Sequence, residues 1–201
     1  MLVLPTRSEN RWGKRSVQWL CIDFLNSDWR DWRGTGRKEN RLAKREWQEW
    51  FLQEHQLQAP LPLDEETVAV LVQFREYMRM LLEKVVSGEA LLQEELEQLN
   101  ETLAKAPFYV RVVPGEEEAT YAQEWHSAIE GWPLVMARIA GSFATLLLPS
   151  HLERIKICDN EDCRWVFYDE SRNRVRRWCD DKMCGNLMKV RRFRERQKEK
   201  K

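Results

Sequence analysis

The clearest pattern of apolar and polar positions in the chain is that of an amphipathic helix beginning at Asp64. Acidic residues occupy its first turn, where negative charge interacts favourably with the helix dipole. Apolar residues then recur at helical spacing until Gly88, and they are Val68, Leu71, Val72, Met78, Leu81, Leu82 and Val85. A second amphipathic helix is predicted from Glu89 to Lys105. Its apolar stripe consists of Leu92, Leu96, Leu99 and Leu103.

The segments before these helices have less decisive patterns. Residues 17–26 mix β-branched, aromatic and other apolar residues, which fits either a buried strand or a short buried helix. Residues 28–40 contain two glycines and are predicted to form a loop. A helix is expected from Leu42 onward, ended by Pro60 and Pro62.

After the second amphipathic helix the pattern changes to one typical of a hairpin. Residues 108–113 and 120–126 are predicted strands, joined by a turn at Pro114 and Gly115. Residues 134–148 are almost wholly apolar, which predicts a helix buried on all sides and preceded by a proline suited to the first helical position. The longest apolar stretch, residues 139–148, is interrupted by Gly, Ser and Thr and is far short of the ~20 residues needed to span a bilayer, so no membrane partner is expected.

Composition supports a mainly helical chain. Eight glycines and seven prolines among 201 residues are few for a many-stranded sandwich. We predict an α+β fold in which residues 1–150 form a helical domain with a few short strands and residues 151–201 form a small C-terminal module. Six of ten tryptophans fall in the first 50 residues, and we interpret them as packing residues. They are Trp12, Trp19, Trp29, Trp32, Trp47 and Trp50.

A formal net charge of zero hides strong segregation along the chain. Residues 54–130 have a net charge of −11, whereas residues 1–53 have +4 and residues 151–201 have +6. The last 16 residues contain eight basic and two acidic side chains. Neutrality therefore does not exclude a nucleic-acid partner, and the acidic middle is interpreted as a solvated helical surface.

Four of the five cysteines form a cluster with the spacing C-x4-C-x15-C-x4-C: Cys158, Cys163, Cys179 and Cys184. Two close pairs at this separation are typical of a four-cysteine zinc site. Two disulfides or four unrelated buried thiols are the alternatives. The chain has no apparent export signal, which predicts a cytoplasmic protein with reduced thiols and favours one structural zinc ion per chain. Four thiolates would leave no open position for catalysis.

The residues between the cysteine pairs are predicted to form a β-hairpin. Residues 164–168 are its first strand, residues 169–173 its turn and residues 175–178 its return strand. A helix should follow Cys184, with Leu187, Val190 and Phe193 facing the hairpin and its basic residues pointing outward. A knuckle, a hairpin and then a helix make up the treble-clef arrangement.

The remaining candidate residues give no catalytic constellation. Cys21 is interpreted as a small buried core residue rather than a nucleophile. The three histidines are scattered, so we expect that the protein is not an enzyme. Asp23 and Asn26 either line a small-ligand pocket or satisfy buried backbone groups.

Residues 157–186 resemble the CGNR zinc finger, a C-terminal module of bacterial transcription regulators. The resemblance rests on the four cysteines, the run CRWVFYDESRNR from Cys163, and Cys-Gly-Asn at residues 184–186. Residues 20–27, LCIDFLNS, are similar to the LDFxNT-like motif of the ABATE domain that precedes this finger. The resemblance implies DNA binding and stress-related regulation. Leu187 stands where the family has arginine, and Lys189 or Arg191 is expected to replace any phosphate contact of that side chain.

Basic residues on the predicted hairpin and last helix are the candidate nucleic-acid contacts. They are Arg172, Arg174, Arg176, Arg177, Lys189, Arg191, Arg192, Arg194 and Arg196. Nucleic-acid binding needs cations gathered on one surface, and arginine suits bidentate contacts; a solvated C-terminal helix is the alternative interpretation.

We therefore predict a zinc-dependent DNA-binding transcriptional regulator. The alternative is a zinc-stabilised module that binds RNA or protein without operator recognition. Because a regulator needs an input, the helical domain is the expected place for a small-molecule effector or a homodimer contact.

Overall fold

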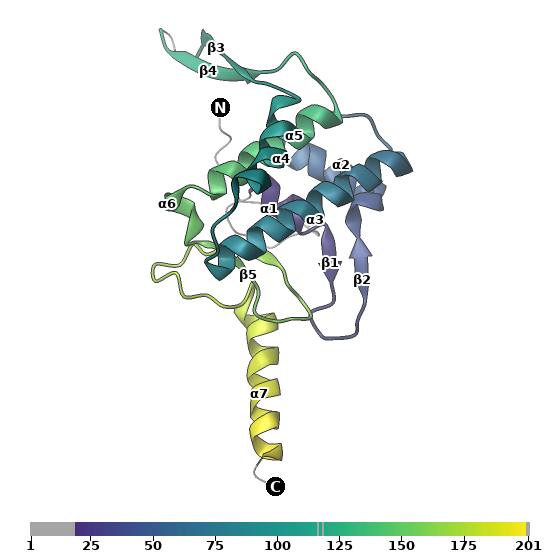
Figure 1. The fold of residues 1–201 in the computed structure, drawn as a ribbon, viewed down its shortest axis with the longest axis vertical. Helices are drawn as coiled ribbons and strands as arrows, with labels where there is room; N and C mark the ends of the chain where they lie inside the picture. The colour runs from purple at the N-terminus through teal and green to yellow at the C-terminus, as the bar shows by residue number, and fades with distance from the viewer. Residues whose placement is uncertain (1–18, 116, 118, 200–201) are drawn as a thin grey trace.

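Helices form about half of the chain in the computed structural model, which describes residues 19–115, 117 and 119–199. The helices are α1 (Leu20–Leu25), α2 (Arg45–Glu54), α3 (Glu65–Ser87), α4 (Gln93–Ala104), α5 (Trp132–Leu146), α6 (Pro149–Leu152) and α7 (Asn186–Lys198) (Figure 1). A 3-10 turn, Arg41–Ala43, precedes α2, and a π-helical turn, Asp181–Gly185, precedes α7. Trp12 and the start of the predicted segment 17–26 lie outside the described residues.

The strands form three separate antiparallel pairs. They are β1 (Asp28–Arg30) with β2 (Lys38–Asn40), β3 (Tyr109–Pro114) with β4 (Tyr121–His126), and β5 (Ile155–Ile157) with β6 (Val166–Tyr168). The predicted mainly helical α+β fold is therefore confirmed. No helix in the described part of the chain has the length and apolar character needed to cross a membrane.

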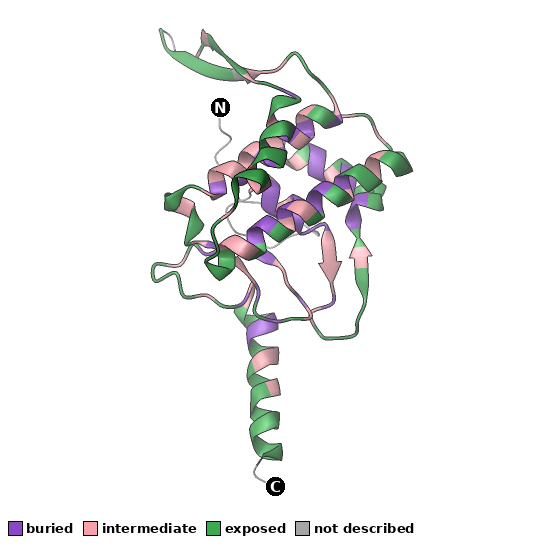
Figure 2. Cartoon of the chain, in the orientation of Figure 1, coloured by how far each residue is buried: buried purple, intermediate pink, exposed green. Residues whose placement is uncertain are grey.

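The core of the molecule forms around α1 and α5. Residues 20–25 form a helix, which was one of the two structures compatible with the sequence pattern. Its side chains Cys21, Phe24 and Leu25 are fully buried. The predicted helix forms, but it is not buried on all sides: seven of the 15 residues of α5 are buried, and the others are half-buried apart from the exposed Pro133 (Figure 2). The apolar character of α5 follows from its contacts with both α1 and α4.

The two amphipathic helices form where the pattern predicts them. The Asp64 carboxylate accepts a hydrogen bond from the backbone N–H of Thr67 at 2.6 Å and begins α3, and Gly88 ends it in the left-handed conformation at φ 86°. The next helix begins later than predicted, at Gln93. Leu92 is its N-cap and is exposed, and Glu95 accepts from the Leu92 N–H at 2.8 Å, so Leu92 does not belong to the buried stripe.

The segment predicted as a loop at residues 28–40 is a β-hairpin. Its tip is organised by Asp31, whose carboxylate accepts from the Arg33 N–H at 3.1 Å and the Thr35 hydroxyl at 2.6 Å. Gly34 and Gly36 have φ of 85° and 76°, so the two glycines mark the turn of a hairpin rather than an open loop.

Packing explains the tryptophans. Among those whose side chains the structure describes, none is exposed. Trp47, Trp132 and Trp178 are buried, and Trp19, Trp29, Trp32, Trp50 and Trp165 are half-buried. The interpretation of the described tryptophans as packing residues is confirmed.

The N-terminal and C-terminal regions share one apolar core. Ile155, Val166 and Tyr168 of the β5–β6 hairpin are buried together with α1 and α3. The Asn26 side chain also crosses between the regions. Its Nδ2 donates to the Val166 carbonyl, and its Oδ1 accepts from the Val166 N–H, both at 2.9 Å. The cysteine-containing region is thus fixed against the helices on one side.

Candidate metal centre and basic helix

The four clustered cysteines converge on one point. The sulfur atoms of Cys158, Cys163, Cys179 and Cys184 all lie within 4.8 Å of one another. The Cys163–Cys179 sulfur distance is 3.7 Å and the Cys179–Cys184 distance is 3.8 Å. A tetrahedral ion ~2.3 Å from each sulfur would separate the sulfurs by ~3.8 Å. The donor set and its dimensions therefore fit a tetrahedral thiophilic metal ion.

Local structure brings the sulfurs together from two directions. Cys158 and Cys163 lie in the tight connection between β5 and β6, where the Cys158 N–H donates to the Trp165 carbonyl at 2.9 Å. Cys184 lies in the π-helical turn before α7, and the Asp180 carboxylate accepts from the Met183 N–H at 2.7 Å to begin that turn. The sulfurs are mostly removed from solvent, which strengthens their interaction with a cation.

Proximity also changes the ionisation of these thiols. The thiols of Cys163, Cys179 and Cys184 act as donors toward Cys158 and hold the pKa of the Cys158 thiol far below its usual range. The same contacts raise the pKa of the Cys163 and Cys179 thiols, so binding of a cation, which requires deprotonated sulfur, would release protons from the cluster.

A buried amide supports the cluster from outside the ligand set. Asn160 is fully buried, and its Nδ2 lies 3.5 Å from the Cys184 sulfur and donates to the Trp32 carbonyl at 2.8 Å. Asn160 therefore connects a metal ligand to the β1–β2 hairpin of the N-terminal region. Interactions of this kind orient metal ligands and tune their affinity.

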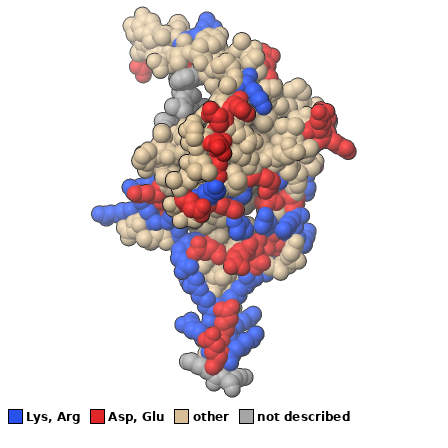
Figure 3. Space-filling model, in the orientation of Figure 1, with Lys and Arg blue, Asp and Glu red and all other residues tan. Residues whose placement is uncertain are grey.

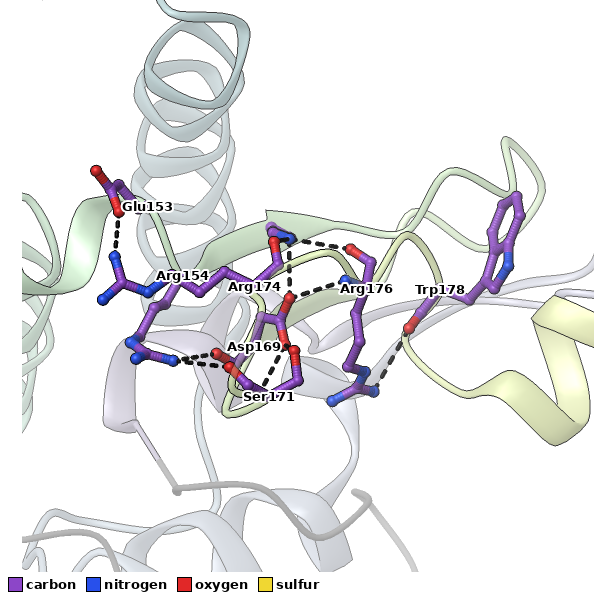
Figure 4. A network of polar contacts seen from close by, with 8 residues as sticks. Glu153, Arg154, Asp169, Ser171, Arg174, Arg176 and Trp178 are labelled. Atoms are coloured by element: carbon purple, nitrogen blue, oxygen red, sulfur yellow. Dashed lines mark hydrogen bonds and ion pairs between the residues drawn. The ribbon is translucent and has the colours of Figure 1, made fainter.

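The predicted return strand at residues 175–178 does not form. β6 instead pairs with β5, so the cysteine knuckle itself is the turn of the hairpin. The segment after the turn is held by the buried carboxylate of Asp169, which accepts from the Arg176 N–H at 2.9 Å, the Lys156 ammonium at 2.8 Å and the Ser171 hydroxyl at 2.6 Å (Figure 4). The Asp169 carboxylate thus holds this segment in place of the backbone hydrogen bonds that a third strand would form.

The ionised state of Asp169 follows from these contacts. Burial alone would raise the pKa of its carboxyl, but hydrogen bonds from Lys156, Ser171 and the Arg176 backbone outweigh burial and hold the pKa well below its usual range. Asp169 therefore stays charged throughout the neutral range and fixes the segment that leads to Cys179.

The sequence comparisons agree with this geometry. Residues 154–197 match the family model of the CGNR zinc finger, and residues 19–148 match the ABATE model, whose description is "Putative stress-induced transcription regulator". The chain belongs to the ABATE family. The resemblance noted in the sequence is confirmed, with the two matches in the expected order. No curated protein matches the sequence.

The last helix of this ABATE protein is placed differently from the prediction. No side chain of α7, which is described along its whole length, is buried, and the helix projects from the body (Figure 1). Val190 and Phe193 do not face the hairpin but are 45% and 56% exposed. Arg191 takes the inward position instead, because it binds the Asp162 carboxylate at 2.7 Å and the Arg33 carbonyl at 3.0 Å.

The candidate basic residues fall into two groups. Four of them make contacts within the protein: Arg174 with Glu153, Arg177 with Asp159, Arg191 with Asp162, and Arg176 with the Cys179 carbonyl at 2.7 Å. The remaining five are exposed and form no ion pair with an acidic side chain in the described part of the chain. They are Arg172 in the turn after β6 and Lys189, Arg192, Arg194 and Arg196 on α7. Figure 3 shows Lys and Arg side chains gathered around the projecting helix.

The other candidates have structural contacts. Cys21 is completely buried, and burial raises the pKa of its thiol to about 12, as expected of a core residue. Asp23 lies 3.0 Å from His55 Nε2. Asn26 satisfies the backbone of Val166, which is the second of its two predicted roles.

Sequence reasoning missed Asn160 and Asp169. Asn160 lies between two ligands of one knuckle, and Asp169 directly follows a run of apolar strand residues. A polar residue at either place is a signal for a buried side chain that serves nearby backbone or ligand atoms. The carboxylate contacts of Lys156 and the inward position of Arg191 have no comparable signal in the sequence.

Proposed function

We propose that this ABATE protein is a zinc-dependent, DNA-binding regulator of transcription. The observation that carries the proposal is the position of α7, a basic helix that begins at the last cysteine and projects from the body with its side chains exposed. The family description supports a regulatory role. Cations held on a rigid helix are suited to the closely spaced phosphates of a nucleic acid.

The metal is proposed to be one structural zinc ion per chain. Four sulfurs at tetrahedral spacing are the ligand set that zinc prefers in structural sites. They would complete its coordination and leave no open position for water or substrate. This favours a binding role over an enzymatic one, and reduced thiols favour a cytoplasmic location.

Charge on α7 should supply most of the affinity. Between residues 186 and 198 the helix has six basic side chains and one acidic side chain. Arg191 is held against Asp162, whereas Lys189, Arg194 and Lys198 are exposed. The acidic helices α3 and α4 belong to the body, from which α7 projects, so their charge is not mixed with that of the helix (Figure 3).

The test is selection from a random pool of duplex DNA with the intact, zinc-loaded protein. Enrichment of a common sequence is expected, and the logarithm of the affinity should fall linearly with the logarithm of salt concentration, with a slope of about −0.9 for each phosphate contacted. Absent or salt-insensitive binding would contradict the proposal and favour a protein partner. Stronger binding to structured RNA than to any duplex would favour an RNA-binding module.

A matched pair of charge reversals locates the contact. Arg194→Glu on α7 should weaken DNA binding and reduce the magnitude of the salt slope by one or more contacts. Lys105→Glu, at an exposed position after α4, changes the net charge equally and should leave binding unchanged. Equal losses in both variants would mean that net charge, and not α7, governs the interaction. An effector site and a homodimer contact in the helical region stay predictions.

A further inference from the structure

The side chains of α7 form four longitudinal stripes with different chemistry. Residues three, four and seven apart share one face of a helix. Met188, Arg191 and Glu195 lie on the face toward the body, where Met188 packs beside the cysteines and Arg191 binds Asp162. The opposite face consists of Asn186, Val190, Phe193 and Gln197.

Both flanks of this outer face are basic. The basic residues of one flank are Lys189, Arg192 and Arg196, and those of the other are Arg194 and Lys198, which follow the half-buried Leu187. All five side chains are exposed. Arg192 also lies over the Trp178 ring at 5.4 Å, and Arg196 donates to the Arg192 carbonyl at 3.3 Å, so this flank is held close to the helix. The outer face is therefore a narrow stripe with two apolar residues at its centre, an amide at each end and a row of cations on either side.

Exposed apolar residues at this place need an explanation. Val190 and Phe193 are 45% and 56% exposed on a helix that has no buried side chain along its described length. A purely electrostatic contact with phosphates would be served by basic residues on all outward positions. An apolar stripe flanked by cations fits a surface that is apolar at its centre and anionic at both edges.

The major groove of B-form DNA has this character. It is ~12 Å wide, matches the diameter of a helix with its side chains, and has phosphates along both edges. Its floor exposes thymine methyl groups, which accept apolar contacts, and adenine edges, which pair with the amide of glutamine. The charge of the flanks complements the two phosphate rows. The major groove of A-form RNA, by contrast, is too narrow to admit a helix.

We propose that α7 lies in the major groove of duplex DNA, with Val190 and Phe193 against thymine methyl groups and Gln197 at an adenine. The inference rests on the proposed DNA-binding function and adds which groove and which bases are read. Arg192 and Arg194 then face opposite phosphate backbones, and Arg191 fixes the angle at which the helix leaves the body.

The test uses a duplex obtained by selection with the full, zinc-loaded chain, compared with the same duplex in which deoxyuridine replaces thymidine. This replacement removes only the methyl groups of the major-groove floor. Wild-type protein should bind the uracil duplex about fourfold more weakly for each contacted methyl lost. Phe193→Ala should weaken binding to the thymine duplex and reduce the loss caused by the replacement to the part that the Val190 contact contributes.

Matched controls separate this inference from the proposed function. Val175→Ala removes an exposed apolar side chain outside α7, where Val175 is 71% exposed, and should change neither binding nor sensitivity to uracil. Zinc content and circular dichroism should match wild type in both variants, because neither side chain is buried.

The outcomes are distinct. Salt-dependent binding that is unaffected by uracil and by Phe193→Ala would overturn the major-groove inference and leave DNA binding standing. Equal affinity for duplex RNA of the same sequence would overturn it as well. No binding to any duplex would overturn both the proposed function and this inference.

Discussion

At Gly185 the packing leaves no room for a side chain larger than a hydrogen atom. A Cβ built there would lie 2.8 Å from Cδ1 of the Trp178 ring; Trp178 directly precedes the third cysteine and Gly185 directly follows the fourth. Gly185→Ala must therefore displace the ring or the turn that positions Cys184, at a cost of about 1–3 kcal/mol in the free energy of unfolding. Urea denaturation of the zinc-loaded chain measures the loss.

Gly141→Ala provides the control for this prediction. Its Cβ would make an ordinary contact at 3.8 Å with Leu103, and alanine is the better helix former within α5. This variant should be as stable as wild type or more stable by about 0.5–1 kcal/mol. Equal effects of the two substitutions would show that the contact between Gly185 and Trp178 is unimportant.

The Asp169 carboxylate is charged although it is buried away from solvent. Its side chain is 0% exposed and interacts with the Lys156 ammonium at 2.8 Å. Asp169→Asn leaves that ammonium with only the carbonyls of Arg174 and Arg176 and no charged partner, and should lower the free energy of unfolding by about 3 kcal/mol, as measured by urea denaturation. Asp159→Asn, which breaks an exposed pair with Arg177, should cost at most about 1 kcal/mol.

The pH dependence of the Asp169 effect has a definite sign. The folded-state pKa is below the value of ~3.9 expected in the unfolded chain, so the stabilisation is complete above that pH and is lost only as the pH falls toward the folded-state pKa. The stability difference between wild type and Asp169→Asn should therefore be equal at pH 7 and pH 5. A difference that grows as the pH falls over this interval would contradict the prediction, because it would mean that folding raises the pKa of the carboxyl.

At the scale of elements, the knuckle between β5 and β6 is joined to the β1–β2 hairpin by one buried amide. Asn160→Ala removes the donors to the Trp32 carbonyl and the Cys184 sulfur. Loss of an outer-shell contact of this kind costs about 10–100-fold in metal affinity. Competition with a chromophoric chelator measures the change, and Asn173→Ala at an exposed position should leave zinc affinity at the wild-type value.

The same elements show what the sequence can and cannot predict. Cysteine spacing and the helical stripes are signals within one element, and the predicted cysteine cluster, α3 and α5 are confirmed. Strand partners depend on competition between elements, and residues 175–178 had an apolar and basic pattern that suited a strand. The Asp169 carboxylate instead accepts a hydrogen bond from the Arg176 N–H, and β6 pairs with β5.

The inward face of α7 was predicted wrongly for a similar reason. Apolar spacing favoured Val190 and Phe193 against the hairpin, since buried apolar area normally decides the orientation of a helix. Arg191 decides it here, because Asp162 and the Arg33 carbonyl lie within its reach at the base of the helix. Both partners come from elements distant in sequence, so no local pattern reveals them.

For the whole molecule, the shared core couples metal binding to the helices. Ile155, Val166 and Tyr168 are 3%, 0% and 8% exposed within the core that contains α1, and their hairpin turns through the two cysteines of the knuckle. Each buried side chain of this size contributes about 1.5–3 kcal/mol, against about 5–15 kcal/mol for a typical domain. Withdrawing the hairpin would therefore remove a large part of the stability of the ABATE region.

We accordingly expect zinc removal by a chelator to lower the melting temperature of the entire chain in a single transition and to increase amide exchange in α1. Re-addition of zinc should restore both. Two independent modules would instead give an unchanged transition for the helices. Asn26→Ala severs the two 2.9 Å hydrogen bonds that join α1 to β6, so this variant should melt at a lower temperature but still in a single transition, because the shared apolar core remains. A chelated wild-type chain with full protection in α1 would contradict the coupling, because the shared core requires that the helices respond to the metal.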